Sequence, residues 1–159
     1  MNMGLSVKVY VNIKPSEFEE DAAFFAYVID DDWKHCIKNL EYDKGYTGDM
    51  VYEGMDYPYS SHSRFRESLV KVMARADLLD GEGKIKWKVL PKDLPFYDLI
   101  WFADNEGCLD WEISETIHAD FVLFDKAAKK ILSDYEYNIY KTWMETFAAA
   151  KANGVVVFC

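Results

Sequence analysis

The stretch from residue 134 to residue 158, DYEYNIYKTWMETFAAAKANGVVVF, decides the fold. Its first part predicts an amphipathic helix over 134–152, because large apolar residues recur there at helical spacing. The residues of this stripe are Tyr137, Tyr140, Met144, Phe147 and Ala148. Asn153-Gly154 has the composition of a helix C-cap. The four apolar residues at 155–158 then predict a strand that is buried on both faces and therefore lies inside a sheet.

Upstream of this stretch, the clearest strand signal is residues 5–13, LSVKVYVNI, in which apolar and polar residues alternate. Apolar stripes at helical spacing predict a helix over 63–79, with Ser63 as its N-cap, and a helix over 112–132 that breaks near Asp125. A short helix is expected over 32–39. Together these segments place helices and strands in the same chain.

In the remaining segments the pattern is ambiguous or short. Ser16 followed by Glu19 fits a capping box, and Glu17, Glu20 and Asp21 add three more acids in the first turn, which predicts a helix over 16–29. A strand over 24–29 is the competing interpretation. Residues 40–62 are expected to form an irregular loop or short hairpin, whose tyrosines either pack their rings or recognise a partner. The alternating run 84–90 and the apolar run 97–103 each predict a strand.

These elements predict one α+β domain that spans residues 1–159. We expect a small mixed sheet of about four strands, packed by three to four helices, with the C-terminal strand inside the sheet.

The formal net charge is −10, and the pI is about 4.7. This charge argues against binding to nucleic acid or to anionic lipid, because both require a positive field. It suits a basic protein partner. No apolar run approaches the roughly 18 residues that a membrane span requires. Cys36, Cys108 and Cys159 form no C-x-x-C pair, which predicts reduced thiols in a cytoplasmic protein.

An acidic turn is the first candidate site. The segment 93–125 contains nine acidic residues and no Lys or Arg. Within it, Asp104, Asn105 and Glu106 follow the predicted strand, and their oxygens suit Mg²⁺ or Ca²⁺. The alternative is a turn closed by its own side chains.

The start of the 63–79 helix is the second candidate site. Ser60 and Ser61 precede His62, so a hydroxyl and an imidazole lie side by side, although adjacency in sequence does not make a catalytic pair. Arg64 and Arg66 can clamp an anion with their guanidinium groups. Alternatively, they form internal ion pairs, of which a bridge from Arg66 to Asp104 or Glu106 is favoured by charge complementarity.

His35 and Cys36 are adjacent and carry metal-binding side chains. A metal site needs three or four converging ligands. The sequence places only these two together, so it predicts no metal site and no cofactor.

Four segments resemble a family of small bacterial and phage proteins. They are Tyr59–Arg66 (Y-S-x-x-x-R-F-R), Phe96–Gly107, which ends in F-x-D-x-E-G, His118–Phe121, and the segment from Tyr140–Trp143 through Gly154–Phe158, which ends in A-x-x-x-G-V-V-x-F. The resemblance covers about residues 57–159 and implies an intact domain. It draws attention to Ser60, Arg64, Arg66, Asp104 and Glu106, but it implies no activity for them.

The sequence therefore favours a non-enzymatic binding protein, of accessory or immunity type, that acts on a basic partner. The binding residues expected for it are Ser60, Ser61, His62, Arg64, Arg66, Asp104, Asn105 and Glu106. The alternative is a small metal-assisted hydrolase that uses the Asp104/Glu106 turn together with His62.

Overall fold

The computed structural model describes residues 4–102 and 106–159. Five strands form one sheet in the order β2-β3-β1-β5-β4, and every described pairing is antiparallel. The strands are β1 (Gly4–Pro15), β2 (Phe24–Phe25), β3 (Gly45–Pro58), β4 (Gly107–Leu109) and β5 (Gly154–Phe158). The α+β class is confirmed, but the sheet is antiparallel where a mixed sheet was expected, and it has five strands where about four were expected.

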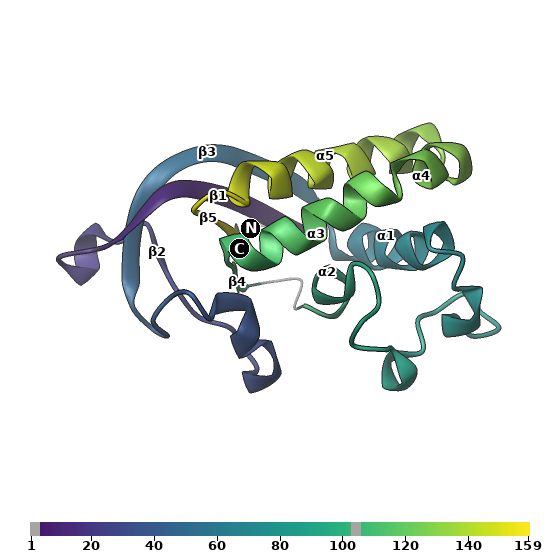
Figure 1. The fold of residues 1–159 in the computed structure, drawn as a ribbon, viewed down its shortest axis with the longest axis horizontal. Helices are drawn as coiled ribbons and strands as arrows, with labels where there is room; N and C mark the ends of the chain where they lie inside the picture. Colours follow the sequence, from purple (N-terminus) through teal and green to yellow (C-terminus); the bar gives the residue numbers. More distant parts are fainter. Residues whose placement is uncertain (1–3, 103–105) are drawn as a thin grey trace.

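The helices pack against this sheet and against each other. They are α1 (Tyr59–Val72), α2 (Tyr97–Trp101), α3 (Trp111–Leu123), α4 (Asp125–Ile131) and α5 (Asp134–Ala150). Helices α3 and α5 lie side by side, and α1, α3 and α5 each contact the sheet (Figure 1). Short 3-10 helices cover η1 (Glu19–Asp21), η2 (Asp31–Ile37), η3 (Ala76–Leu78) and η4 (Trp87–Val89).

The C-terminal helix and strand form the centre of the fold, as their sequence predicted. Strand β5 lies between β1 and β4, and all of its residues except the half-buried Val157 are buried. Tyr140, Trp143 and Phe147 of α5 are fully buried. The ring of Trp143 stacks on that of Phe158, with 5.8 Å between the centroids. The helix thus covers the strand that follows it and buries its aromatic face.

Strand β3 and the first turn of α1 replace the irregular loop or short hairpin that was expected over 40–62. Its glycines and tyrosines lack the alternation of apolar and polar residues that is typical of a strand. Pairing with the neighbouring strand β1, and not local preference, decides its conformation. A Cβ atom on Gly48 would lie 2.8 Å from the carbonyl oxygen of Val11 on β1, so glycine permits the close pairing there. The pairing of β1 with β3 shifts register at three places, and the long strand curls over the helices (Figure 1).

Two predicted strands are wrong. Residues 97–101 form helix α2, because Phe96 adopts a left-handed conformation (φ 62°) and turns the chain before this apolar run. Residues 84–90 form one 3-10 turn and a single bridge between Ile85 and Leu79. Short apolar runs fit a buried helix as well as a strand, and these two lack a neighbouring strand with which to pair.

The remaining helix predictions hold in part. The predicted break near Asp125 separates α3 from α4, and a 3-10 helix occupies most of 32–39. Helix α1 begins at Tyr59 directly after Pro58, so the expected N-cap Ser63 lies inside the helix. Residues 16–29 contain only η1 and the two-residue β2, so neither interpretation of that segment describes it fully. None of the helices in the described ranges is long and apolar enough to cross a membrane.

Candidate functional site

The first turns of α1 carry most of the predicted binding residues, but they point in different directions. Ser60 and Arg64 are exposed, Ser61 is half-buried, and His62 and Arg66 are buried. A helix that packs on one side must alternate in this way. The proposed cluster is therefore divided between the interior and the surface.

His62 belongs to the interior. It is fully buried, and its Nδ1 atom forms a short hydrogen bond with the hydroxyl of Tyr57, which in turn accepts one from Nε1 of Trp143 at 3.2 Å. Burial, and then the nearby charge of Arg66, hold the pKa of His62 well below its usual value. A neutral imidazole that joins β3, α1 and α5 in this way is a packing residue and is closed to a substrate.

Arg66 also faces inward, where Nη2 donates a short hydrogen bond to the carbonyl of Phe102. Its guanidinium lies over the ring of Trp87, 5.9 Å from the centroid. Glu106 accepts a hydrogen bond from the hydroxyl of Tyr27 at 3.0 Å. Burial, followed by this contact with Glu106, raises the pKa of Tyr27 to about 12. The predicted residues Asp104 and Asn105 lie outside the described ranges. Of the bridge expected from Arg66 to Asp104 or Glu106, the Asp104 alternative therefore also lies outside them, and the contact described for the Glu106 carboxylate is the one with Tyr27.

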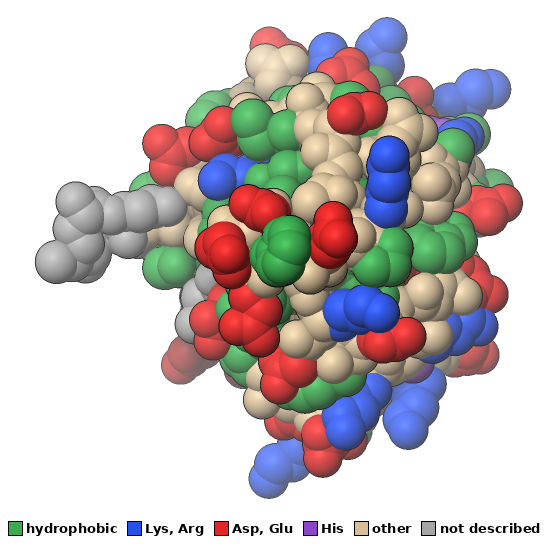
Figure 2. All heavy atoms as spheres, turned by 90° about the vertical axis from the view of Figure 1, so that its left-hand side faces the viewer, with side chains coloured by type: hydrophobic (Ala, Val, Ile, Leu, Met, Phe, Trp, Pro, Cys, Tyr) green, Lys and Arg blue, Asp and Glu red, His purple; other side chains and the backbone are tan. Residues whose placement is uncertain are grey.

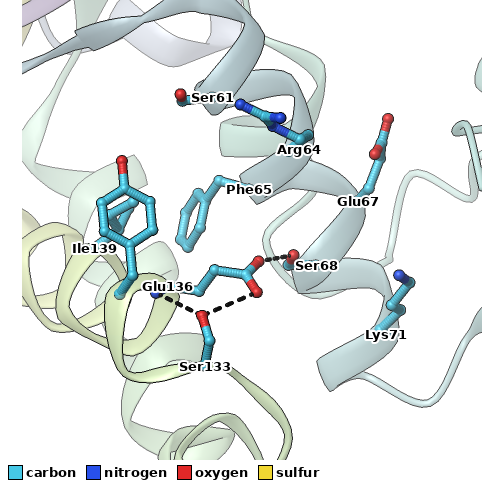
Figure 3. Close-up of a pocket in the computed structure, with 10 residues that line it drawn as sticks. Ser61, Arg64, Phe65, Glu67, Ser68, Lys71, Ser133, Glu136 and Ile139 are labelled. Atoms are coloured by element: carbon cyan, nitrogen blue, oxygen red, sulfur yellow. Dashed lines mark hydrogen bonds between the residues drawn. The ribbon is translucent and has the colours of Figure 1, made fainter.

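The outward residues Ser61 and Arg64 line a groove of about 500 Å³ between α1 and α5 (Figure 3). The other residues that line it are Phe65, Glu67, Ser68, Lys71, Ser133, Tyr135, Glu136 and Ile139. Glu136 accepts hydrogen bonds from Ser68 and from Ser133, the latter at 3.4 Å. Because Ser133 also caps α5 through the amide of Glu136, these contacts hold the two helices together.

A second surface feature lies at the opposite end of the molecule from this groove (Figure 1). We call it the acidic tip, residues 16–21. Its backbone is ordered by local contacts: the hydroxyl of Ser16 donates to the carbonyl of Phe18 at 2.6 Å, and the amide of Asp21 donates to the same carbonyl at 3.1 Å. The amide of Ser16 donates to the carbonyl of Gly45 on β3 at 2.9 Å, which ties the tip to the sheet.

The tip presents an aromatic side chain among acids. Phe18 is 55% exposed, and acidic side chains gather around an apolar one on this face of the molecule (Figure 2). The four acids of the tip, all exposed, are Glu17, Glu19, Glu20 and Asp21. Within residues 4–102 and 106–159, no Lys or Arg lies within ion-pair distance of any of these four.

The sequence pattern of the tip predicts a helix and not an exposed acidic surface. Acids after Ser16 were interpreted as the first turn of a helix, where they favour the helix dipole. The structure forms only one 3-10 turn there, so the charges serve no long helix. Comparison of the chain with protein-family models, with curated proteins and with solved structures finds no match in any of the three.

Proposed function

We propose that this protein is a non-enzymatic binding protein of the cytoplasm that docks a basic protein partner on the acidic tip. The observation that carries the proposal is the exposed ring of Phe18 surrounded by four acids that have no cation beside them among the described residues. The free thiols of Cys36, Cys108 and Cys159 are consistent with a reducing compartment.

The charge distribution supports this role for the tip. Some acids elsewhere on the surface are paired with a cation: Asp31 pairs with Lys34 at 3.2 Å, and Glu112 pairs with Lys38 at 2.8 Å. The acids of the tip contribute their full charge to a net charge of −10. Such a concentration of one sign steers a basic partner toward the surface and accelerates association.

The aromatic ring of Phe18 contributes affinity, which the charges alone supply poorly. Charged groups at the rim of an interface contribute mostly to the association rate, whereas buried aromatic residues contribute most of the affinity. The backbone of Phe18 is fixed by the hydrogen bonds of its carbonyl with Ser16 and Asp21, so the main chain needs little further ordering when a partner covers the ring. A role as an accessory or immunity-type protein, together with the likeness to small bacterial and phage proteins, belongs to the same proposal.

The hydrolase alternative receives less support. It requires His62 beside a ligand, but His62 is fully buried and bonded to Tyr57. A general base must come within hydrogen-bond reach of its substrate.

The test begins with capture of partners from the source cell by the wild-type protein, followed by calorimetry with each purified partner. We expect a basic partner whose affinity falls as salt rises, and which binds Phe18→Ala at least about tenfold more weakly, equivalent to about 1.4 kcal/mol. Neutralising the tip with Glu17→Gln, Glu19→Gln, Glu20→Gln and Asp21→Asn should weaken binding further.

A matched control variant has the same net charge as the neutralised tip variant but keeps the acids of the tip. It carries Gln at four exposed acids elsewhere, Glu53, Glu82, Glu115 and Glu145. This control should bind within about threefold of the wild type, since distant charges are screened beyond roughly 10 Å. Equal losses in the tip variant and the control, or a partner that binds Phe18→Ala normally, would show that the tip is not the docking surface.

A further inference from the structure

We propose that His35, Cys36 and Asp98 form a binding site for one divalent transition-metal ion, with Zn²⁺ as the best-fitting ion. The three ligand atoms, His35 Nε2, Cys36 Sγ and an Asp98 carboxylate oxygen, all lie within 4.8 Å of one another. This site is separate from the acidic tip and does not depend on the proposed function.

The fold places these ligands on two separately anchored elements. Cys36 lies near the end of η2, where its carbonyl accepts a hydrogen bond from the amide of Asp110 at 2.7 Å. Asp98 lies in the first turn of α2, which begins at the left-handed residue Phe96. The amide of Phe96 donates to the carboxylate of Asp120 on α3 at 3.0 Å. Both elements are thus tied to α3 or to its N-cap, and the ligands are brought together by the tertiary structure.

The separations suit a small tetrahedral ion after two adjustments, a larger one between His35 and Asp98 and a smaller one between Cys36 and Asp98. Bonds of about 2.0–2.3 Å in a tetrahedral zinc site place ligand atoms roughly 3.3–3.7 Å apart. Cys36 Sγ lies 3.5 Å from His35 Nε2 and 4.0 Å from Asp98 Oδ1. His35 Nε2 and Asp98 Oδ1 lie 2.6 Å apart, in a hydrogen bond that must open by roughly 1 Å. The His35 side chain is 47% exposed, so it can rotate by this amount.

The donor set selects the metal. A thiolate, an imidazole and a carboxylate are all zinc ligands, whereas Mg²⁺ and Ca²⁺ prefer oxygen alone. On binding, the Cys36 thiol releases its proton to solvent and the sulfur becomes a thiolate ligand. His35 binds through Nε2 as a neutral imidazole that keeps its proton on Nδ1.

A cavity gives two of the three ligands, His35 and Asp98, access to solvent, whereas Cys36 is fully buried. It has a volume of about 450 Å³ and is lined by Asp32, His35, Lys92, Tyr97, Asp98 and Trp101. Three protein ligands leave the fourth tetrahedral position to a water molecule or to the carboxylate of Asp32, which lines the same cavity.

The experiment titrates the purified, chelator-treated protein with Co²⁺ and then with Zn²⁺. We expect one equivalent of Co²⁺ to bind with the charge-transfer absorption of a cobalt–thiolate bond, and Zn²⁺ to abolish that absorption by displacement. His35→Gln and Asp98→Asn should each weaken binding at least about tenfold. Cys36→Ser should remove the charge-transfer band.

The control variants are Cys159→Ser, which removes an exposed thiol, and His118→Gln, which removes a histidine from α3. Both should bind Co²⁺ as the wild type does. Because Cys36 is buried and its substitution can impair folding, His35→Gln and Asp98→Asn decide the matter, with folding checked by circular dichroism. Absence of a thiolate band, an unchanged affinity for Co²⁺ in both of these variants, or a band lost in Cys159→Ser would overturn the proposal.

Discussion

Asp110 is a buried carboxylate that connects three parts of the fold, and its replacement by alanine gives a sharp test of the structure. The side chain is fully buried. Its Oδ1 caps α3 by accepting from the amides of Glu112 and Ile113 at 3.1 and 3.2 Å. Its Oδ2 accepts from the amide and the side-chain nitrogen of Asn39, both at 3.1 Å, and so holds the segment that follows η2. Asp110→Ala removes all four contacts.

The expected loss follows from these contacts. Loss of an N-cap costs about 1 kcal/mol, and at most about 2. Each hydrogen bond from Asn39 to the charged acceptor adds about 1.5 kcal/mol, at the low end because Asn39 is exposed and water can replace the bond. One effect reduces this loss. Burial raises the pKa of Asp110 despite the four hydrogen bonds, so the ionised carboxylate itself lowers the stability of the folded protein, and its removal recovers part of the free energy. The net loss should be about 2–3 kcal/mol.

Linkage gives the sign of this offset. Because the folded-state pKa of Asp110 is raised, its contribution to stability is fully present below the unfolded value of about 3.9 and is lost as pH rises through the folded value. A measurement at pH 7 lies above the unfolded value and therefore includes this offset.

The assay is urea unfolding of both proteins at pH 7, followed by tryptophan fluorescence, together with thermal unfolding. A loss of about 2–3 kcal/mol corresponds to a fall in Tm of roughly 5–10 °C for a chain of this size. Glu112→Ala is the matched control, because Glu112 is an exposed neighbour whose ion pair with Lys38 should contribute less than about 1 kcal/mol. A change below about 0.5 kcal/mol for Asp110→Ala, with an unchanged m-value, would refute the reasoning.

Two further predictions concern His62 and the turn between α5 and β5. Burial lowers the pKa of His62, so at low pH the unfolded chain binds a proton that the folded protein excludes. The free energy of unfolding of the wild type should therefore fall by up to about 1.4 kcal/mol per pH unit below about pH 6.5 relative to His62→Gln. Urea unfolding that gives parallel pH curves for the two proteins would contradict this, and His118→Gln should show a smaller effect. Gly154→Ala should cost about 1–3 kcal/mol, because its Cβ would lie 2.8 Å from the backbone of Ala150. Gly81→Ala, with no atom within 4 Å of its Cβ, should change stability by less than about 0.5 kcal/mol in the same assay, and equal effects would show that the contact is harmless.

Local sequence determined those elements whose patterns are long and carry their own end signals. The alternation of residues 5–13 appears as β1, and the stripe of 134–152 followed by Asn153-Gly154 appears as α5 and its end, where Asn153 adopts φ 55°. The break near Asp125 was also visible. In these segments, period, cap and burial all favour the same conformation, so no distant contact was needed to decide it.

Short or glycine-rich segments were decided by contacts far along the chain. Strand β3 exists because β1 pairs with it, and α2 exists because the buried Phe96 turns the chain and bonds to Asp120, 24 residues away. A short run such as 97–103, which consists of six apolar residues and Asp98, carries too little information to distinguish a helix from a strand.

For the candidate functional sites, too, the sequence identified some residues and the tertiary structure decided the rest. Sequence identified His35 and Cys36 as neighbours, but Asp98, 63 residues from His35, joins them only through the packing of η2 and α2. It also identified the acids after Ser16 and the net negative charge. Only the tertiary structure placed Phe18 outward among them and buried His62 and Arg66, because the direction of a side chain depends on which face of its element the rest of the chain covers.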